Sequence, residues 1–353
     1  MYYCGIDYHK RYSVVSMMNE EGQTVTERRI GHQAPHLFEE LLAGADQPVK
    51  VVFENSLNWS WLYEILERIQ NVKQIVLANP YKVKLISEAQ IKTDKIDAGK
   101  LAHLLRLDVI PACHVPSRRM RERKETLRQR TFWVREQTKV RSRIHKIIGR
   151  QHDLNMPQVT DLFGAKGRAA LNKVVLPAPD DLLLKQNLTV LDTLKSLIKE
   201  AEKQIEADGQ SDPDVGILQS VPGIGLTIGN VMACEIDGIK RFRTVRHFLG
   251  YCGLVPSTYS SGGKTHHGRM LNGCNKWLKW AFIEASWVAI GCSPYFGALY
   301  AHHRVRGKKA NTAICITAHR MAEIIYRLLN EQRNYKERIY SGCSGIGLRA
   351  SAA

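Results

Sequence analysis

The sequence lacks the closely spaced cysteine pairs that structural zinc sites use. Its eight cysteines are scattered, and no two of them form a C-x-x-C pair. This spacing argues against both structural zinc and the disulfide framework of a small secreted domain. Reduced thiols in a cytoplasmic protein are the simplest interpretation.

Long apolar runs and a targeting segment are also missing. No stretch approaches the roughly 20 apolar residues of a membrane-spanning helix. The first residues, 1–5, lead directly into a predicted strand, with no basic region and no cleavage pattern. We therefore expect no membrane partner.

Acidic residues are too few to balance the basic ones. The 353 residues include 51 Lys and Arg against 34 Asp and Glu, which gives a formal net charge of +17. The hydrophobic fraction of 44% suits ordinary packed cores, and the length allows two domains with connecting helices. The charge predicts a polyanionic partner, and nucleic acid is the favoured one.

Residues 1–108 have the pattern of an α/β domain. We expect strands at 2–6, 12–19, 24–30, 49–53 and 72–77 and helices at 36–43 and 59–69. The turn Glu20-Glu21-Gly22 would join the second and third strands as a hairpin. A meander followed by alternating strands and helices fits the ribonuclease-H-like fold, although other α/β folds would suit it too.

Four carboxylates fall at the ends of these elements. Asp7 and Glu54 each follow a predicted buried strand, and Asp94 and Asp97 begin a predicted helix that runs to Leu107. Because Asp94 and Asp97 are three residues apart, their side chains face the same way. Such groups can hold two divalent ions roughly 3.5–4 Å apart for phosphoryl transfer. The pattern favours an enzyme that processes polynucleotides. The neighbouring His9 and His103 are expected to be surface or packing residues.

Residues 118–150 are strongly basic. They include 13 Lys or Arg against three acidic residues, and an apolar stripe runs through them. A basic amphipathic helix that faces a phosphate backbone is our interpretation, and a merely solvated helix face is the alternative. The expected nucleic-acid contacts here and near the carboxylates are Lys92, Arg118, Arg119, Arg121, Arg128, Arg135, Lys139 and Arg143.

A Gly- and Pro-rich loop is expected over residues 164–179, and a heptad stripe follows it. Leu184, Leu191, Ile198 and Ile205 recur every seven residues. This spacing predicts a long helix that pairs with another helix, from a second subunit or from the same chain. Both alternatives give the same pattern.

The C-terminal part contains a Gly-rich turn and a Gly-rich serine segment. Val221-Pro222-Gly223-Ile224-Gly225 is typical of a helix-hairpin-helix, whose backbone N–H groups can bind phosphate, so Gly223 and Gly225 are candidate contacts. A flexible loop is expected from Gly253 to Lys264, with a serine placed to attack a phosphodiester. Its candidate cations are Lys264, His267, Arg269 and Lys276.

A family resemblance extends over roughly residues 1–330. The motifs are Gly5-Ile6-Asp7, Phe53-Glu54, Asn79-Pro80, Lys92 to Ala98, Val221 to Gly225, Phe248 to Pro256 and Tyr259-Ser260-Ser261-Gly262. In order and spacing they resemble the transposases of insertion sequence family 110, which are DEDD-type recombinases that work with a guide (bridge) RNA. The resemblance implies that Asp7, Glu54, Asp94 and Asp97 hold Mg²⁺ in a RuvC-like domain.

The resemblance also implies a nucleophile and partners. Ser261 occupies the serine of a Tyr-x-Ser-Gly pattern, and Ser260 stands where family members often have an acidic residue. Ser261 is the favoured nucleophile, and Ser260 is the alternative. The implied reaction joins the serine to a DNA 5′-phosphate and releases a 3′-hydroxyl. Donor and target DNA, the guide RNA and a homodimer or dimer of dimers with composite sites are the implied partners.

Two other functions share part of this pattern. A junction resolvase would use the carboxylates with water as the nucleophile, and Ser261 would be structural. A non-catalytic helix-hairpin-helix protein would bind nucleic acid, and its carboxylates would be ordinary caps and ion pairs. The expected organisation is a RuvC-like domain (1–117), a basic helical and coiled-coil linker (118–210), a C-terminal transposase domain with the serine loop (211–333) and a flexible tail (334–353).

Overall fold

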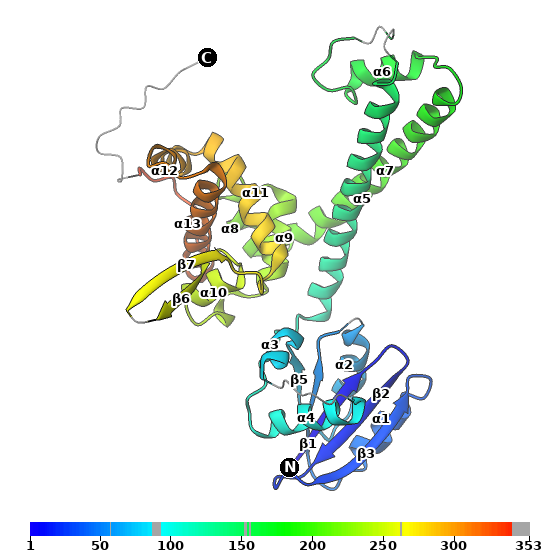
Figure 1. Cartoon of the computed structure of the whole chain (residues 1–353), viewed down its shortest axis with the longest axis vertical. Coiled ribbons are helices and arrows are strands. Elements are labelled where there is room, and N and C mark those ends of the chain that lie inside the picture. The colour runs from blue at the N-terminus through cyan, green and yellow to red at the C-terminus, as the bar shows by residue number, and fades with distance from the viewer. Residues whose placement is uncertain (57, 87–92, 152–153, 155–156, 262, 341–353) are drawn as a thin grey trace. The chain divides into compact units, whose positions relative to one another are not determined.

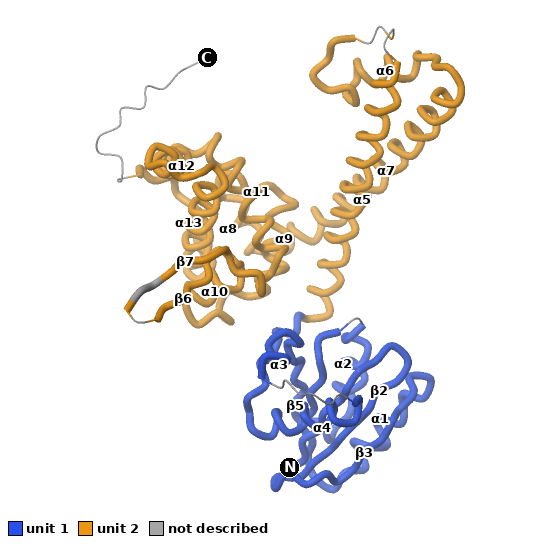
Figure 2. The backbone as a smooth tube through the Cα atoms, in the orientation of Figure 1, with its two compact units in different colours: residues 1–116 blue, residues 117–353 orange. Residues whose placement is uncertain are grey.

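The computed structural model describes residues 1–340 except 57, 87–92, 152–153, 155–156 and 262. The chain divides into two compact units, Met1–Pro116 (unit 1) and a second that begins at Ser117 (unit 2; Figure 2). Among the described residues, no helix is both long enough and apolar enough to span a membrane.

Unit 1 is built on one five-stranded sheet (Figure 1). Its strands are β1 (Tyr2–Tyr8), β2 (Tyr12–Met18), β3 (Thr24–Gly31), β4 (Val49–Glu54) and β5 (Val72–Ala78), and their order is β3-β2-β1-β4-β5. β1, β4 and β5 run parallel, and β2 is antiparallel to both β1 and β3. The expected α/β domain is confirmed, with strand bounds within one to two residues of the prediction.

Helices cover both faces of this sheet because alternate side chains of a strand point to opposite sides. On one face, α1 (His36–Ala43) and α2 (Trp59–Glu67) share a core with Phe53 of β4. On the other face, α3 (Pro80–Ile86) and α4 (Asp94–Arg106) pack against the neighbouring Val52.

Gly5 allows α4 to lie directly on β1. A Cβ at Gly5 would overlap the carbonyl oxygen of Ala98 and lie 2.5 Å from the backbone nitrogen of Ala102, both in α4. The start of α4 is fixed by Thr93, whose hydroxyl accepts a hydrogen bond from the backbone N–H of Ile96. The close approach therefore sets where the first turn of α4 lies over the sheet.

The described part of unit 2 consists mainly of helices, with a two-stranded hairpin between two of them. Its helices are α5 (Arg118–Ile148), α6 (Ala165–Lys173), α7 (Asp180–Gln210), α8 (Pro213–Gln219), α9 (Leu226–Ile236), the 3₁₀ turn η1 (Ile239–Arg241), α10 (Val245–Tyr251), α11 (Lys276–Cys292), α12 (Pro294–Val305) and α13 (Ala310–Glu331). The hairpin consists of β6 (Pro256–Ser261) and β7 (Lys264–Met270). The segment predicted as a loop over 164–179 contains α6, because Leu171 is buried in the core between α5 and α7.

The long helices α5 and α7 pack side by side and antiparallel (Figure 1). Leu184 and Leu191 are buried with Ile144 of α5 at one end of the pair, and Ile205 is buried with Leu127 at the other. The heptad stripe is therefore covered by a helix of the same chain. Of the two alternatives left open by the sequence, the intramolecular one is observed.

The first turns of α5 are anchored by buried ion pairs. Arg123, only 4% exposed, lies 2.6 Å from Asp212 and donates to the Asn230 side chain at 3.0 Å. Lys124 is also buried and lies 3.3 Å from Glu235. Part of the charge of the basic helix is thus directed into the protein.

Residues 333–340 follow α13 without regular secondary structure, yet they are packed. The Tyr335 ring stacks on Phe296 at a centroid distance of 6.3 Å, and its backbone N–H donates to the Ser220 hydroxyl at 2.8 Å. Glu337 accepts hydrogen bonds from the Ser293 hydroxyl and the Tyr295 backbone N–H. The part of the expected tail that the structure describes is therefore docked on α8 and α12, and residues 341–353 lie outside the described part.

Gly5→Ala is expected to destabilise the protein by about 3 kcal/mol, the upper part of the usual range for overpacking, because backbone atoms of α4 must move. Gly99→Ala, in α4 itself, is the matched control. Its new Cβ would lie 3.7 Å from the Ser16 hydroxyl, an ordinary contact, and replacing a helical glycine gains about 1 kcal/mol. Urea unfolding of both variants measures the difference, and equal midpoints would contradict the role given to Gly5.

Candidate metal centre and serine hairpin

Asp7 and Glu54 meet at one edge of the sheet in unit 1. β1 and β4 are parallel and pair Ile6 with Phe53, so the next residue of each strand reaches the same edge. The Asp7 carboxylate is 24% exposed, and Glu54 is the last residue of β4. The strand ends place these two carboxylates as the sequence predicts.

Asp94 and Asp97 lie in the first turn of α4, as expected. Because α4 packs on β1, that turn approaches the Asp7 carboxylate. Burial is the largest effect on Asp7 and raises its pKa; nearby His9 lowers it, and the negative charges of Asp94 and Asp97 raise it. The helical pair is therefore close enough to Asp7 for its charges to act on that carboxylate.

One side of the site is a cavity of about 250 Å³. Three of the predicted carboxylates, Asp7, Glu54 and Asp97, line it. Two lysines, Lys84 and Lys100, also line it, and the Lys100 ammonium donates to Asp97 at 3.3 Å. The lysines balance charge that the carboxylates would otherwise hold without a cation.

The other side of the site is a group of three residues around His9. The Nε2 atom of His9 lies 3.2 Å from an oxygen of Asp7 and 3.2 Å from an oxygen of Asp94. The Tyr12 hydroxyl donates to the same Asp94 oxygen at 2.9 Å, and this hydrogen bond is the main cause that lowers the Asp94 pKa. Asp7 therefore belongs to both the cavity and this second group.

His9, which we expected to be a surface or packing residue, lies beside two of the carboxylates. Ligand atoms of Asp7, His9 and Asp94 all lie within 4.8 Å of one another, so one ion could reach all three. The sequence contained a signal for the contact between His9 and Asp7, because residues two apart on a strand point to the same face. His9 falls just past the end of β1, and only the fold places it against Asp94.

These residues fit a divalent cation. Carboxylate oxygens are the ligands that hard ions such as Mg²⁺ and Mn²⁺ use, and an imidazole nitrogen is compatible with Mn²⁺ and Zn²⁺. Asp7, which belongs to both groups of residues, would be among the ligands that hold such an ion.

The candidate serine lies in unit 2 on the hairpin, which replaces the flexible loop expected from the sequence. Ser261 is the last residue of β6 and pairs with Lys264 at the start of β7. Ser260 and Ser261 are both exposed, and the neighbouring Tyr259 is 70% exposed. Residues such as Thr258 and Tyr259 favour strands, and this propensity explains why the segment pairs instead of forming a loop.

The candidate cations near the serine occupy different elements. Arg269 is exposed on β7, and Lys276 is the first residue of α11. Lys264 and His267 belong to β7, and their side chains lie outside the described part of the structure. Gly262 of the Tyr-x-Ser-Gly motif is outside it as well.

The predicted contacts of α5 divide into two groups. Near its start, Arg118 pairs with Glu122 at 3.1 Å, Arg119 donates to Ser211 at 2.7 Å, and Arg121 is partly buried. Farther along, Arg128 lies 3.0 Å from Glu125 and 3.4 Å from the buried Glu235. These contacts give the first half of the helix a structural role.

The second half of α5 presents its charges outward. Arg135 and Arg143 are exposed, and Lys139 pairs with Glu136 of the same helix. A shallow basic groove there is lined by Lys139, Arg143, Lys146 and Arg150. Lys92, the remaining candidate, lies outside the described residues.

The glycines of the predicted phosphate-binding turn have different surroundings. Gly223 has φ +87°, and a Cβ there would press on the backbone of Ala285 and Ala289 in α11. Gly225 is exposed and precedes the first turn of α9, where backbone N–H groups are unpaired within the helix. Gly223 is therefore required for packing, and Gly225 leaves the helix start open.

Two family models match the chain. One, for DEDD transposases of the IS110 type, matches residues 4–151, and the other, described as the IS116/IS110/IS902 transposase family, matches residues 215–301. The first match contains Asp7, Glu54, Asp94 and Asp97, and the second contains Ser261. Both candidate sites thus fall within matched segments.

Curated relatives agree with these matches. The chain is 26% identical to an uncharacterized 43.6 kDa protein of insertion element IS110 from Streptomyces coelicolor and 27% identical to a probable family 20 transposase from Pseudomonas aeruginosa. These matches cover 52% and 46% of the chain but only 45% and 48% of the relatives. A transposase for insertion element IS1328 from Yersinia enterocolitica is 22% identical, over 91% of the chain and 95% of its own length. The chain belongs to the IS116/IS110/IS902 family of insertion-sequence transposases.

Proposed function

We propose that this protein is an RNA-guided DNA recombinase that cuts and rejoins the strands of an insertion sequence through a covalent phosphoserine. The observation that carries the proposal is the meeting of Asp7, Glu54, Asp94 and Asp97 around the first turn of α4. A helical second unit with an exposed serine on a hairpin supplies the other half of the chemistry.

The topology of unit 1 supports a RuvC-like assignment. Its order β3-β2-β1-β4-β5, with a β1–β3 meander and parallel β1, β4 and β5, is the arrangement expected of ribonuclease-H-like domains. Two of the carboxylates, Asp7 and Glu54, lie at the carboxyl ends of adjacent parallel strands, where ligands of α/β sheets commonly bind.

The carboxylates and the serine would have separate roles. Asp7, Glu54, Asp94 and Asp97 would hold Mg²⁺, with His9 as a neighbour of Asp7 and Asp94. When bound, the divalent ions would neutralise charge on the phosphate and favour an ionised serine hydroxyl. Lys100, beside Asp97, would help to position a phosphate at the cavity.

The covalent step would begin with Ser261. Its Oγ would attack the phosphorus of a DNA strand and lose its proton, and the bond from phosphorus to the 3′ oxygen would break. The released 3′ oxygen would take up a proton, and the 5′ phosphate would remain on the serine. A 3′-hydroxyl can later attack this phosphoserine and reseal a strand without an external energy source, because the ester stores the bond energy.

Nucleic acid would be bound by the second half of α5 and by the start of α9. Arg135, Lys139 and Arg143 are positioned for backbone phosphates, and the N–H groups after Gly225 suit a helix-hairpin-helix contact. Base pairing with a guide RNA would select the DNA sequence, while the protein contacts backbones. Composite sites in a dimer or dimer of dimers would bring a serine hairpin to the carboxylates.

The described cysteines are all unpaired thiols, which fits the cytoplasm as the place of this activity.

A junction resolvase that uses water is the second candidate function, since it needs the same carboxylates. It differs by predicting DNA cleavage without any protein–DNA adduct.

Ser261→Ala is expected to abolish the covalent protein–DNA adduct. Full-length protein, Mg²⁺, the guide RNA and labelled DNA are combined, denatured and separated by electrophoresis. Ser260→Ala, the matched control one residue away, should keep the adduct. Cleavage that persists in Ser261→Ala without an adduct would assign the protein to the resolvases, and an adduct lost only in Ser260→Ala would move the nucleophile by one residue.

Asp7→Asn is expected to weaken divalent metal binding more than Asp97→Asn or His9→Asn, because only Asp7 belongs to both ligand groups. Binding of Mn²⁺ is measured by electron paramagnetic resonance. For Asp7→Asn the Mn²⁺ affinity is expected to fall at least about tenfold, which is the usual effect of removing a group that supports a metal site.

Asp108→Asn is the control for this measurement. Asp108 is an exposed carboxylate of unit 1 with φ +57°, a conformation that asparagine also adopts readily. Its replacement should leave Mn²⁺ binding unchanged. Equal binding by all four variants would show that these carboxylates hold no metal.

A further inference from the structure

A basic pocket lies at the C-terminal end of unit 2, away from the residues assigned above. It is formed by α13 and by the segment that follows it. Its lining consists of Arg320, Ile324, Arg327, Leu328, Arg333, Tyr335, Lys336 and Arg338. Five of these eight residues are basic and none is acidic.

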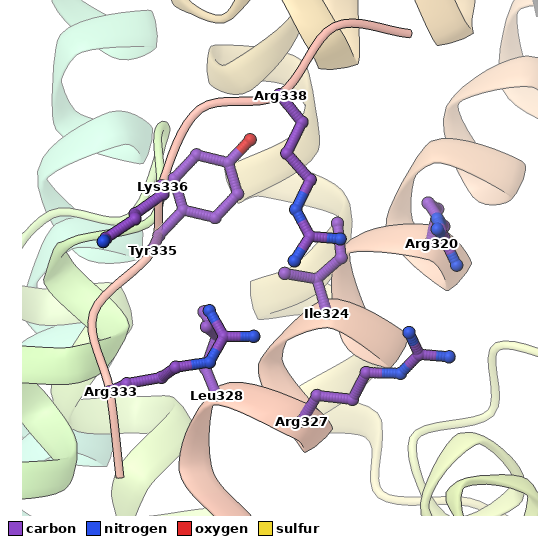
Figure 3. Close-up of a pocket in the computed structure, with 8 residues that line it drawn as sticks. All are labelled: Arg320, Ile324, Arg327, Leu328, Arg333, Tyr335, Lys336 and Arg338. Atoms are coloured by element: carbon purple, nitrogen blue, oxygen red, sulfur yellow. The ribbon is translucent and has the colours of Figure 1, made fainter. Parts of the chain in front are cut away.

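The residues from α13 share one face of that helix. Arg320, Ile324, Arg327 and Leu328 are spaced by three, four, seven and eight residues, so they lie along neighbouring turns. Figure 3 shows the guanidinium groups of Arg327, Arg333 and Arg338 around Ile324 and Leu328, while the ammonium end of Lys336 is turned away from them. Short apolar side chains form the floor, and cations form the rim.

The segment after Gln332 forms the other wall of the pocket, and contacts with the rest of unit 2 hold that segment in place. Tyr335 is fixed by its stacking on Phe296 and its hydrogen bond to Ser220, and Glu337 is fixed by Ser293 and Tyr295. Arg333, Lys336 and Arg338 alternate with these anchored residues. They are therefore presented by a docked segment and do not belong to a free tail.

Only part of the positive charge in this pocket is compensated. Arg320 lies 2.6 Å from Glu323, and Arg333 pairs with Glu331. Arg327, Lys336 and Arg338 have no ion pair within the part of the chain that the structure describes. The following residues 339–353 contain Arg349 and no acidic residue.

The remaining polar groups cannot neutralise this charge. Glu337 is engaged at the start of α12. Burial and the nearby negative charge of Glu337 raise the pKa of Tyr335 to about 12, so its phenol is neutral at working pH. Like charges that are held close together repel one another, and an anion between them would remove that cost.

We propose that this pocket binds a phosphate group of a nucleic-acid backbone. Planar guanidinium groups match phosphate oxygens through paired hydrogen bonds, and several of them around one opening suit a single phosphodiester. The exposed positions of Arg327, Lys336 and Arg338 leave the opening accessible to a strand. The site would be a contact additional to α5 and the hairpin, and it rests on the proposed function for its choice of ligand.

The test measures binding of labelled duplex DNA and of labelled RNA by full-length protein at increasing salt. Each phosphate contact that is lost lowers the slope of log K against log salt by about 0.9 for duplex DNA and about 0.7 for single strands. The double variant Arg327→Gln/Arg338→Gln should lower the slope by one to two contacts. A change with DNA only, with RNA only or with both identifies the strand that the pocket binds.

Two further double variants control for charge and folding. Lys308→Gln/Lys309→Gln removes the same charge from the exposed connection between α12 and α13 and should leave the slope unchanged. Arg327→Lys/Arg338→Lys keeps the charge and should retain most of the slope. Equal slopes for wild type and the glutamine variant of the pocket would overturn the proposal, and so would an equal loss in the Lys308/Lys309 control.

A free anion is the other source of the same chemistry. Inorganic phosphate is therefore titrated calorimetrically into wild type and the glutamine variant of the pocket. Phosphate binding that the variant loses, together with an unchanged salt slope, would overturn the nucleic-acid proposal in favour of a small-anion site. The adduct assay is separate: a wild-type protein that forms no adduct would contradict the recombinase, while a changed slope would still support this contact.

Discussion

The close packing of α4 on β1 is the constraint on which the candidate metal centre depends. Only a glycine at position 5 leaves room for the α4 backbone, and this contact brings the first turn of α4 over the ends of β1 and β4. The four carboxylates come from three distant segments, and no local interaction among them would hold like charges together. Sheet pairing and helix packing supply the force that opposes their repulsion, and a divalent cation would relieve it.

Some basic residues of unit 2 form buried ion pairs, and others are exposed on its surface. Arg123 and Lys124 are buried against Asp212 and Glu235, where breaking a pair would leave an uncompensated charge. Glu235 also accepts from the Asn275 side chain, which caps the start of α11 directly after the serine hairpin. α5, which carries the exposed Arg135 and Arg143, is thereby linked through Glu235 to α11, the helix that follows the serine hairpin.

The proposed chemistry requires residues of both units. Unit 1 supplies carboxylates but no candidate serine, and unit 2 supplies the exposed hairpin without a carboxylate cluster among its described residues. In the proposed reaction, such a division of groups would let assembly on nucleic acid decide when a strand is cut. Phosphate contacts spread over α5, α9 and the pocket on α13 would contribute to that assembly through the same salt-dependent attraction.

The sequence by itself determined most of the secondary structure and the positions of the four carboxylates. Those features depend on local periodicity: apolar runs bound by acidic residues define β1, β4 and α4. It left the partner of the heptad stripe open, did not place His9 against Asp7 and Asp94, predicted a loop where β6 and β7 pair, and predicted mobility where Tyr335 and Glu337 are anchored. Only the tertiary structure decided these points, because each depends on contacts between residues far apart in the chain, which no local pattern encodes.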